Sequence, residues 1–160
     1  YTGFLYAGLM IDAEGNPSVI EYNCRFGDPE TQPIMHRLQS DLSALCLAAI
    51  DGRLDQMTAD WDPRPAVGVV LAAGGYPGSY EKGHEIQGLN AAWPVTTKVF
   101  HAGTQQAGES VITQGGRVLC VSALGDSIAD AIGAAYAGVD QISWEGMVCR
   151  RDIGWRAIDR

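Results

Sequence analysis

The chain has 160 residues, 46% of them hydrophobic, and a formal net charge of −8 from 11 basic and 19 acidic side chains. This excess of acid argues against nucleic acid as a partner, because phosphate-backbone binding needs clustered Lys and Arg. The longest apolar runs, such as AVGVVLAA, are far shorter than the roughly 20 residues that cross a bilayer, so no membrane is predicted. A cytoplasmic protein with small-molecule partners is the expectation, and four cysteines without a C-x-x-C pair predict free, mostly buried thiols.

The first third of the chain predicts a β-hairpin followed by helical structure. Residues 4–11 and 18–23 are rich in apolar and aromatic side chains, and the turn-forming sequence DAEGNP separates them at 12–17. Apolar residues then recur at helical spacing over 34–50. This run is either one helix or two, the second capped by Ser40 or Asp41.

Residues 53–65 lose periodicity and carry two prolines, which predicts a domain boundary. The predicted domains are residues 1–62 and 63–160. Within the second, the expected elements are strands at 66–73, 98–102, 110–113 and 117–124, with QGG at 114–116 closing a hairpin between the last two, and a helix at 127–139. The predicted fold class is α+β, with a small β-rich second domain that has one main helix.

The most informative stretch is VIEYNCRFGDPE at residues 19–30, where a predicted strand ends in charged and amide groups. Alternate residues of a strand share a face, so Glu21, Asn23 and Arg25 converge there while the strand lasts, with Val19 further back. Glu and Asn supply the hard oxygen ligands that Mg²⁺ prefers, and an arginine nearby steadies a phosphoryl group. Solvated residues on an edge strand are the alternative.

Six blocks of sequence resemble one family in the same order along the whole chain. They are IEYNCRFGDPETQ, RLQSDL, AAGGYPGSYEKG, KVFHAGT, GGRVL and RRDIGWRA. They are similar to the glycinamide ribonucleotide synthetases, ATP-grasp ligases of purine synthesis. The resemblance implies that residues 1–62 form the end of the ATP-grasp domain and that 63–160 form the family's C-terminal domain.

The resemblance also implies a set of site residues. Glu21 and Asn23 match the family's ligands for Mg²⁺ or Mn²⁺, and Arg25 matches the arginine near the transferred phosphate, the one catalytic residue expected. Many ATP-grasp relatives place a further acid on the preceding strand, but residues 4–11 hold none. The implied reaction joins glycine to 5-phosphoribosylamine with ATP hydrolysis, through a glycyl phosphate that the amine captures.

Two acids in the loop after the predicted strand are candidates for substrate binding. Asp28 and Glu30 suit the ammonium of glycine or the ribosylamine, although Asp before Pro also forms turns and Glu also favours a helix start. Gly27, directly before Asp28, is expected to allow a tight turn.

Near the C-terminus, Arg150 and Arg151 are candidates for binding the ribose phosphate, as a basic pair does in related purine ligases. Ion pairs with Asp152 or Asp159 are the alternative.

The family's phosphate-covering loop and nucleotide-binding lysine would precede Tyr1, so the chain is expected to be a C-terminal fragment that is inactive alone. Two other hypotheses remain. One is a noncatalytic binding module that kept the fold, and the other is a different ATP-grasp branch such as a biotin-dependent carboxylase subunit. No M-K-M biotin acceptor occurs in the chain, which disfavours the second. The sequence leaves the oligomeric state open.

Overall fold

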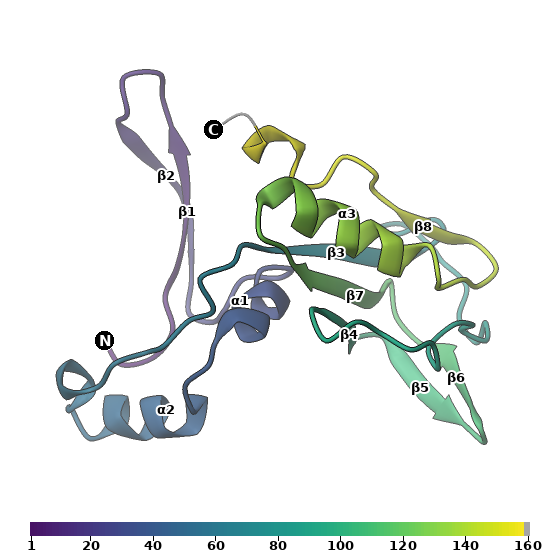
Figure 1. Cartoon of the computed structure of the whole chain (residues 1–160), viewed down its shortest axis with the longest axis horizontal. Coiled ribbons are helices and arrows are strands. Elements are labelled where there is room, and N and C mark those ends of the chain that lie inside the picture. Colours follow the sequence, from purple (N-terminus) through teal and green to yellow (C-terminus); the bar gives the residue numbers. More distant parts are fainter. Residues whose placement is uncertain (159–160) are drawn as a thin grey trace. The chain divides into compact units, whose positions relative to one another are not determined.

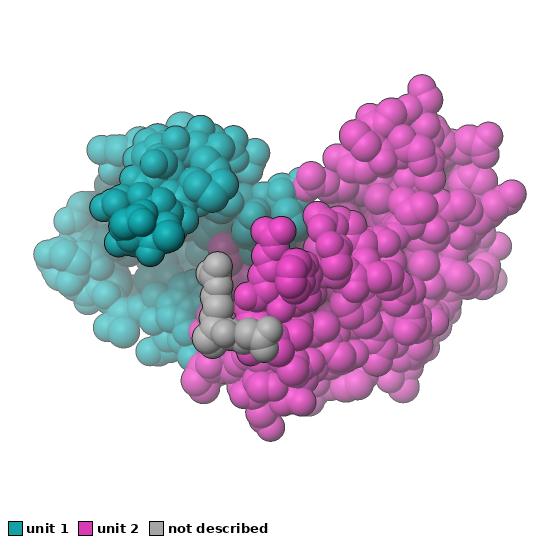
Figure 2. Space-filling model, turned by 90° about the horizontal axis from the view of Figure 1, so that it is seen from above, with its two compact units in different colours: residues 1–31, 38–61 teal, residues 32–37, 62–160 magenta. Residues whose placement is uncertain are grey.

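A computed structural model describes residues 1–158 and confirms the α+β class (Figure 1). The chain divides into two compact units, which Figure 2 shows in different colours. Unit 1 comprises residues 1–31 and 38–61, and unit 2 comprises residues 32–37 together with the chain from 62 onward. Among the described residues, no helix is long and apolar enough to span a bilayer.

Unit 1 begins with a hairpin of two antiparallel strands, β1 (Tyr6–Ile11) and β2 (Pro17–Asn23). Asp12 fixes its turn, because its carboxylate accepts hydrogen bonds from the backbone and side-chain nitrogens of Asn16 at 2.7 and 3.0 Å. The register shifts between Gly8 and the next residue of β1, which marks a β-bulge.

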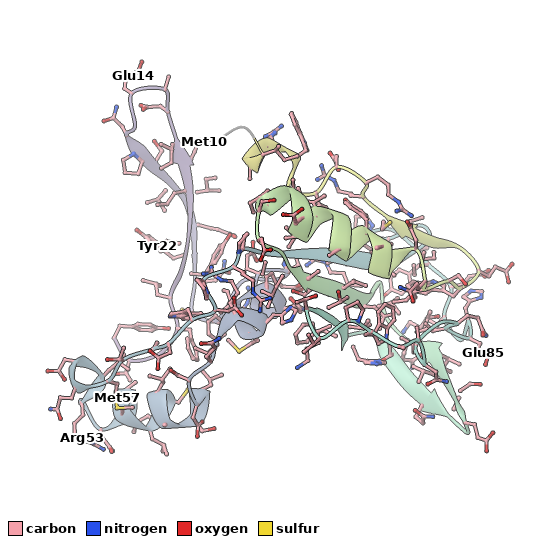
Figure 3. All side chains as sticks on the ribbon, viewed as in Figure 1. Met10, Glu14, Tyr22, Arg53, Met57 and Glu85 are labelled. Carbon is pink, nitrogen blue, oxygen red and sulfur yellow. The ribbon has the colours of Figure 1, made fainter. Side chains whose placement is uncertain are left out.

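The hairpin leaves most of its apolar side chains exposed. Met10 and Tyr22, which Figure 3 labels on the two strands, are 61% and 59% exposed. In the described chain this hairpin is a separate two-stranded sheet, and most of its apolar side chains face solvent.

The helical part of the chain contains two helices rather than one. Helix α1 (Thr31–Arg37) has Pro33 in its first turn, where a missing N–H costs nothing. Helix α2 (Leu42–Ile50) starts at Asp41, whose carboxylate accepts the N–H groups of Ser43 and Ala44. The 3₁₀ turn η1 (Leu54–Gln56) follows in unit 1.

Unit 2 is built on an antiparallel sheet with the strand order β4-β7-β3-β8. Its strands are β3 (Ala66–Ala73), β4 (Thr97–His101), β7 (Arg117–Leu124) and β8 (Met147–Cys149). Strands β5 (Thr104–Ala107) and β6 (Ser110–Thr113) form a separate hairpin, helix α3 (Ile128–Val139) follows β7, and the 3₁₀ turn η2 (Trp155–Ala157) ends the described elements.

The core of unit 2 lies between α3 and the sheet. Alternate residues of β3 are buried, from Val67 through Leu71 to Ala73, which is the period of a strand with one face in a core. On the other face, α1 packs against the sheet, where Pro33 lies over Gly68 and His36 Nδ1 is 3.0 Å from the Ser122 hydroxyl. The region from 62 onward therefore has its own apolar core.

Two sequence predictions about these elements are wrong. Residues 114–116 do not close a hairpin, because β6 pairs with β5 while β7 pairs with β3 and β4. Instead, the connection from β4 to β5 and the connection from β6 to β7 lie side by side. Gly103 in the first and Gly115 in the second approach so closely that a side chain on Gly103 would clash. The four cysteines are free, as expected, but only Cys120 is buried and Cys24 is exposed.

Candidate functional site

The end of β2 brings two of the predicted site residues together. Asn23 Nδ2 donates a hydrogen bond of 3.1 Å to Glu21 Oε1. Their partners across the hairpin are Gly8, opposite Glu21, and Tyr6, opposite Asn23. Because Gly8 has no side chain, the Glu21 side chain lies over it, with Cγ 3.1 Å from where a Cβ would stand. The hairpin thus fixes both polar groups on one face.

This pair has the donor chemistry of a divalent-cation site. In an octahedral Mg²⁺ shell with bonds of about 2.1 Å, neighbouring ligand atoms lie about 3.0 Å apart. The amide of Asn23 stands 3.1 Å from the Glu21 carboxylate, and turning that amide over would place its oxygen where its nitrogen now lies. No group of three or more His, Cys, Asp or Glu residues suited to a metal occurs in the described chain. A cation at this pair would be held by one carboxylate and one carboxamide.

Val19 and Arg25 do not extend this face as alternation predicts. The bulge places Val19 opposite Leu9 instead of continuing the register of Glu21, which interrupts the alternation. Arg25 lies beyond the last residue of β2, and its guanidinium donates a 2.8 Å hydrogen bond to the carbonyl of Phe26. The structure therefore brings Glu21 and Asn23 together, whereas Arg25 is exposed and hydrogen-bonded to the following loop.

The loop after β2 is held by contacts around Gly27. Its carbonyl accepts two hydrogen bonds from Thr31, at 3.0 Å from the N–H and 2.6 Å from the hydroxyl. A Cβ at Gly27 would lie 2.3 Å from Glu30 Oε2 and 3.0 Å from Tyr6 Cε2. The chain does turn here, since the Gly27 carbonyl accepts the N–H of Thr31, and the absence of a side chain at Gly27 makes room for Glu30 and Tyr6 although its φ is not positive. Asp28, on the same loop, is exposed.

Glu30 and Tyr6 contact each other across this loop. The Tyr6 hydroxyl donates a 3.2 Å hydrogen bond to Glu30 Oε1. The negative charge of Glu30, followed by this hydrogen bond, burial and the charge of Glu21, raises the pKa of the Tyr6 phenol. Sequence reasoning missed Tyr6, although its place opposite Asn23 in a hairpin with a recognisable turn was a usable signal.

Arg150 and Arg151 lie in unit 2, directly after β8. Arg150 forms a bidentate ion pair with Asp152, with N···O distances of 2.9 and 2.6 Å. Arg151 donates a 2.7 Å hydrogen bond to Asp140 and lies over the Tyr136 ring, 5.5 Å from its centroid.

These carboxylates raise the pKa of both arginines, chiefly by hydrogen bonding, and the arginine partner lowers the pKa of Asp152. Arg150 thus forms the predicted ion pair with Asp152, whereas Arg151 pairs with Asp140, which the sequence did not indicate, and Asp159 lies outside the described residues. All these groups are exposed, so a competing anion has access to them.

Comparison with known families and proteins gives matches along almost the whole chain. The model of the phosphoribosylglycinamide synthetase C domain matches residues 66–156, and that of the ATP-grasp (A) domain of the same enzyme matches residues 1–31. Phosphoribosylamine–glycine ligases from Vibrio cholerae and Allochromatium vinosum are 66% and 64% identical over 160 residues. The chain is covered completely in both cases, but it spans only 37% of the length of these relatives.

Solved structures give the same result. The crystal structure of phosphoribosylamine–glycine ligase from Thermotoga maritima matches 92% of this chain and 36% of its own, with a TM-score of 0.76 and 36% identity. The biotin carboxylase subunit of pyruvate carboxylase matches 95% of this chain and 34% of its own, with a TM-score of 0.60 at 14% identity, which shows a shared fold alone.

The fold is therefore that of the ATP-grasp enzymes. Within that class, the chain belongs to the phosphoribosylglycinamide synthetase family. The resemblance drawn from the six sequence blocks is thus confirmed.

Proposed function

We propose that these residues form the C-terminal part of a phosphoribosylamine–glycine ligase of de novo purine synthesis. The observation that carries the proposal is 66% identity over all 160 residues to the Vibrio cholerae ligase, with Glu21 and Asn23 in contact at a strand end. The substrates are glycine, 5-phosphoribosylamine and ATP. The glycine carboxylate attacks the γ-phosphate of ATP, and the amine of phosphoribosylamine then displaces phosphate from the resulting glycyl phosphate.

In this proposal the chain supplies metal ligands and phosphate-binding groups. Glu21 and Asn23 would hold Mg²⁺ or Mn²⁺, and a cation there would supply positive charge against the polyphosphate of ATP. Arg25 leaves the Phe26 carbonyl to stabilise the phosphoryl group in transfer. This fits an exposed guanidinium held by one neutral acceptor, because a phosphoryl oxygen is the stronger partner for it.

The remaining candidates bind substrates. Asp28 and Glu30 follow the metal pair closely in sequence and suit the ammonium of glycine. Arg150 and Arg151 suit the ribose phosphate, which would replace Asp152 and Asp140 as their anionic partner.

A graft tests the function directly. Because the chain aligns with the Vibrio cholerae ligase along its whole length, residues 1–160 can replace the aligned segment of that enzyme. We call this protein the grafted ligase. We expect it to release ADP only when both glycine and phosphoribosylamine are present, and we expect the matched Glu21→Gln graft to fold but to lose most of this activity. A folded graft without ADP release would favour a noncatalytic module instead.

A further inference from the structure

Tyr6 lies between the strand that carries Asn23 and the loop that carries Glu30. It is half-buried in β1, opposite Asn23, and shares a face with Gly8, over which the Glu21 side chain lies. Its ring edge contacts Gly27, and its hydroxyl donates to Glu30 Oε1. One side chain therefore connects the hairpin that carries the metal pair to the loop that follows it.

Both oxygens of the Glu30 carboxylate are placed by this arrangement. Oε1 accepts the phenol hydrogen bond at 3.2 Å, while Oε2 lies against Gly27, 2.3 Å from where a Cβ would stand. Rotation of the carboxylate is thus restricted by a donor on one side and by packing on the other.

The phenol orients the carboxylate without neutralising it. Among residues 1–158, no Lys, Arg or His forms an ion pair with Glu30. A neutral donor leaves the full negative charge available, unlike an arginine partner, which would cancel it. Since the Glu30 charge raises the pKa of the phenol, Tyr6 stays a protonated donor at neutral pH.

We propose that Tyr6 is a positioning residue that holds Glu30 as an anionic acceptor for the ammonium group of glycine; the inference rests on the ligase function proposed above. Of the two amine substrates, glycine is the match, because its ammonium is cationic when its carboxylate attacks ATP. The amine of phosphoribosylamine must instead be neutral to attack the acyl phosphate, so a carboxylate gains little by binding it.

Tyr6→Phe in the grafted ligase tests the proposal, since phenylalanine keeps the ring against Gly27 and removes only the hydroxyl. We expect KM for glycine to rise about ten- to hundredfold, as loss of one hydrogen bond to a charged carboxylate implies. The KM values for ATP and phosphoribosylamine should stay within twofold. Tyr22→Phe is the matched control, because Tyr22 lies on the same hairpin, 59% exposed and opposite Ala7, and should change none of these constants.

A double-mutant cycle with Glu30→Gln completes the experiment. If Tyr6 acts through Glu30, then Tyr6→Phe has little further effect on KM for glycine in the Glu30→Gln background. An unchanged KM for glycine in Tyr6→Phe, a uniform rise in all three KM values, or additive effects in the cycle would each overturn the proposal. Failure of the ligase function itself is separate, because it appears as an inactive parent graft.

Discussion

Replacing Gly27 by alanine would measure how much the placement of Glu30 matters. The new Cβ would stand 2.3 Å from Glu30 Oε2, whereas ordinary contacts begin near 3.4 Å, so the carboxylate must move by 3.4 − 2.3 = 1.1 Å. The φ of Gly27 is not in the left-handed region, so the backbone itself accepts alanine. The substitution therefore acts mainly on the Glu30 carboxylate, while the ring edge of Tyr6, 3.0 Å from the new Cβ, has to give by only a few tenths of an ångström.

Such a shift should affect activity far more than stability. The displaced group is the end of a flexible side chain, and a Gly-to-Ala change at a compatible site itself stabilises by about 0.4–1 kcal/mol. This gain opposes the loss of the solvent-accessible hydrogen bond from Tyr6 to the Glu30 carboxylate, so we expect the free energy of unfolding to change little. A misplacement near 1 Å lowers the rate by up to about 10²-fold, so kcat/KM for glycine should fall about ten- to hundredfold.

The assay is steady-state kinetics of the grafted ligase with thermal unfolding alongside. Gly133→Ala, in the exposed part of α3 with no atom within 4 Å of its Cβ position, is the control that should leave kcat/KM unchanged. In a Glu30→Ala background, Gly27→Ala should lose most of its effect, because the clashing carboxylate is gone. Full activity of Gly27→Ala, or an undiminished loss in that background, would refute the reasoning.

Three further predictions concern other groups. Glu21→Ala and Asn23→Ala in the grafted ligase should each abolish most turnover with an unchanged circular dichroism spectrum; near-normal turnover would show that neither holds a metal. Arg25→Ala should lower kcat more than it raises any KM, whereas Arg151→Ala should raise KM for phosphoribosylamine about ten- to hundredfold. The reverse pattern in steady-state kinetics would assign the ribose phosphate to Arg25 and the transferred phosphoryl group to Arg151. Hydrogen bonding to an arginine lowers the pKa of Asp62 to about 2, so its contribution to stability is complete above pH 4 and is lost as the pH falls toward 2. The free energy of unfolding in urea should therefore be higher for wild type than for Asp62→Asn at pH 6, and the difference should be much smaller at pH 2.5. An equal difference at both pH values would contradict the lowered pKa of Asp62.

Local signals in the sequence were sufficient to predict those elements whose ends are fixed by neighbouring residues. The hairpin β1–β2 followed from turn chemistry that Asp12 and Asn16 do supply, and α2 begins where Asp41 caps it. The predicted pairing of β6 with β7 is wrong, because strands that follow each other in the sequence need not be neighbours in a sheet. In the structure the connections before β5 and after β6 lie side by side, with Gly103 and Gly115 in close approach, and no local pattern reports such a contact.

The candidate site divides in the same way. Strand alternation was sufficient to place Glu21 beside Asn23, since both lie within one strand and on the same side of its bulge. It failed for Arg25, because β2 ends at Asn23 and the backbone then turns into the loop. Tyr6 was missed because its role comes from contacts with Gly27 and Glu30, which lie far from it in the sequence.

The residues of the candidate site differ in how firmly they are held. Glu21, Asn23 and Tyr6 are held by the backbone hydrogen bonds of one hairpin, so their relative positions are set before any ligand arrives. Arg25 depends on a single 2.8 Å hydrogen bond to a neighbouring carbonyl, which a phosphoryl oxygen readily displaces. In the ligase that we propose, a guanidinium that follows charge from ATP to the acyl phosphate would benefit from this freedom, whereas a metal ligand would not. The proposed roles therefore fit how the groups are held, because Glu21 and Asn23 contact each other within one strand while Arg25 is exposed beyond its end.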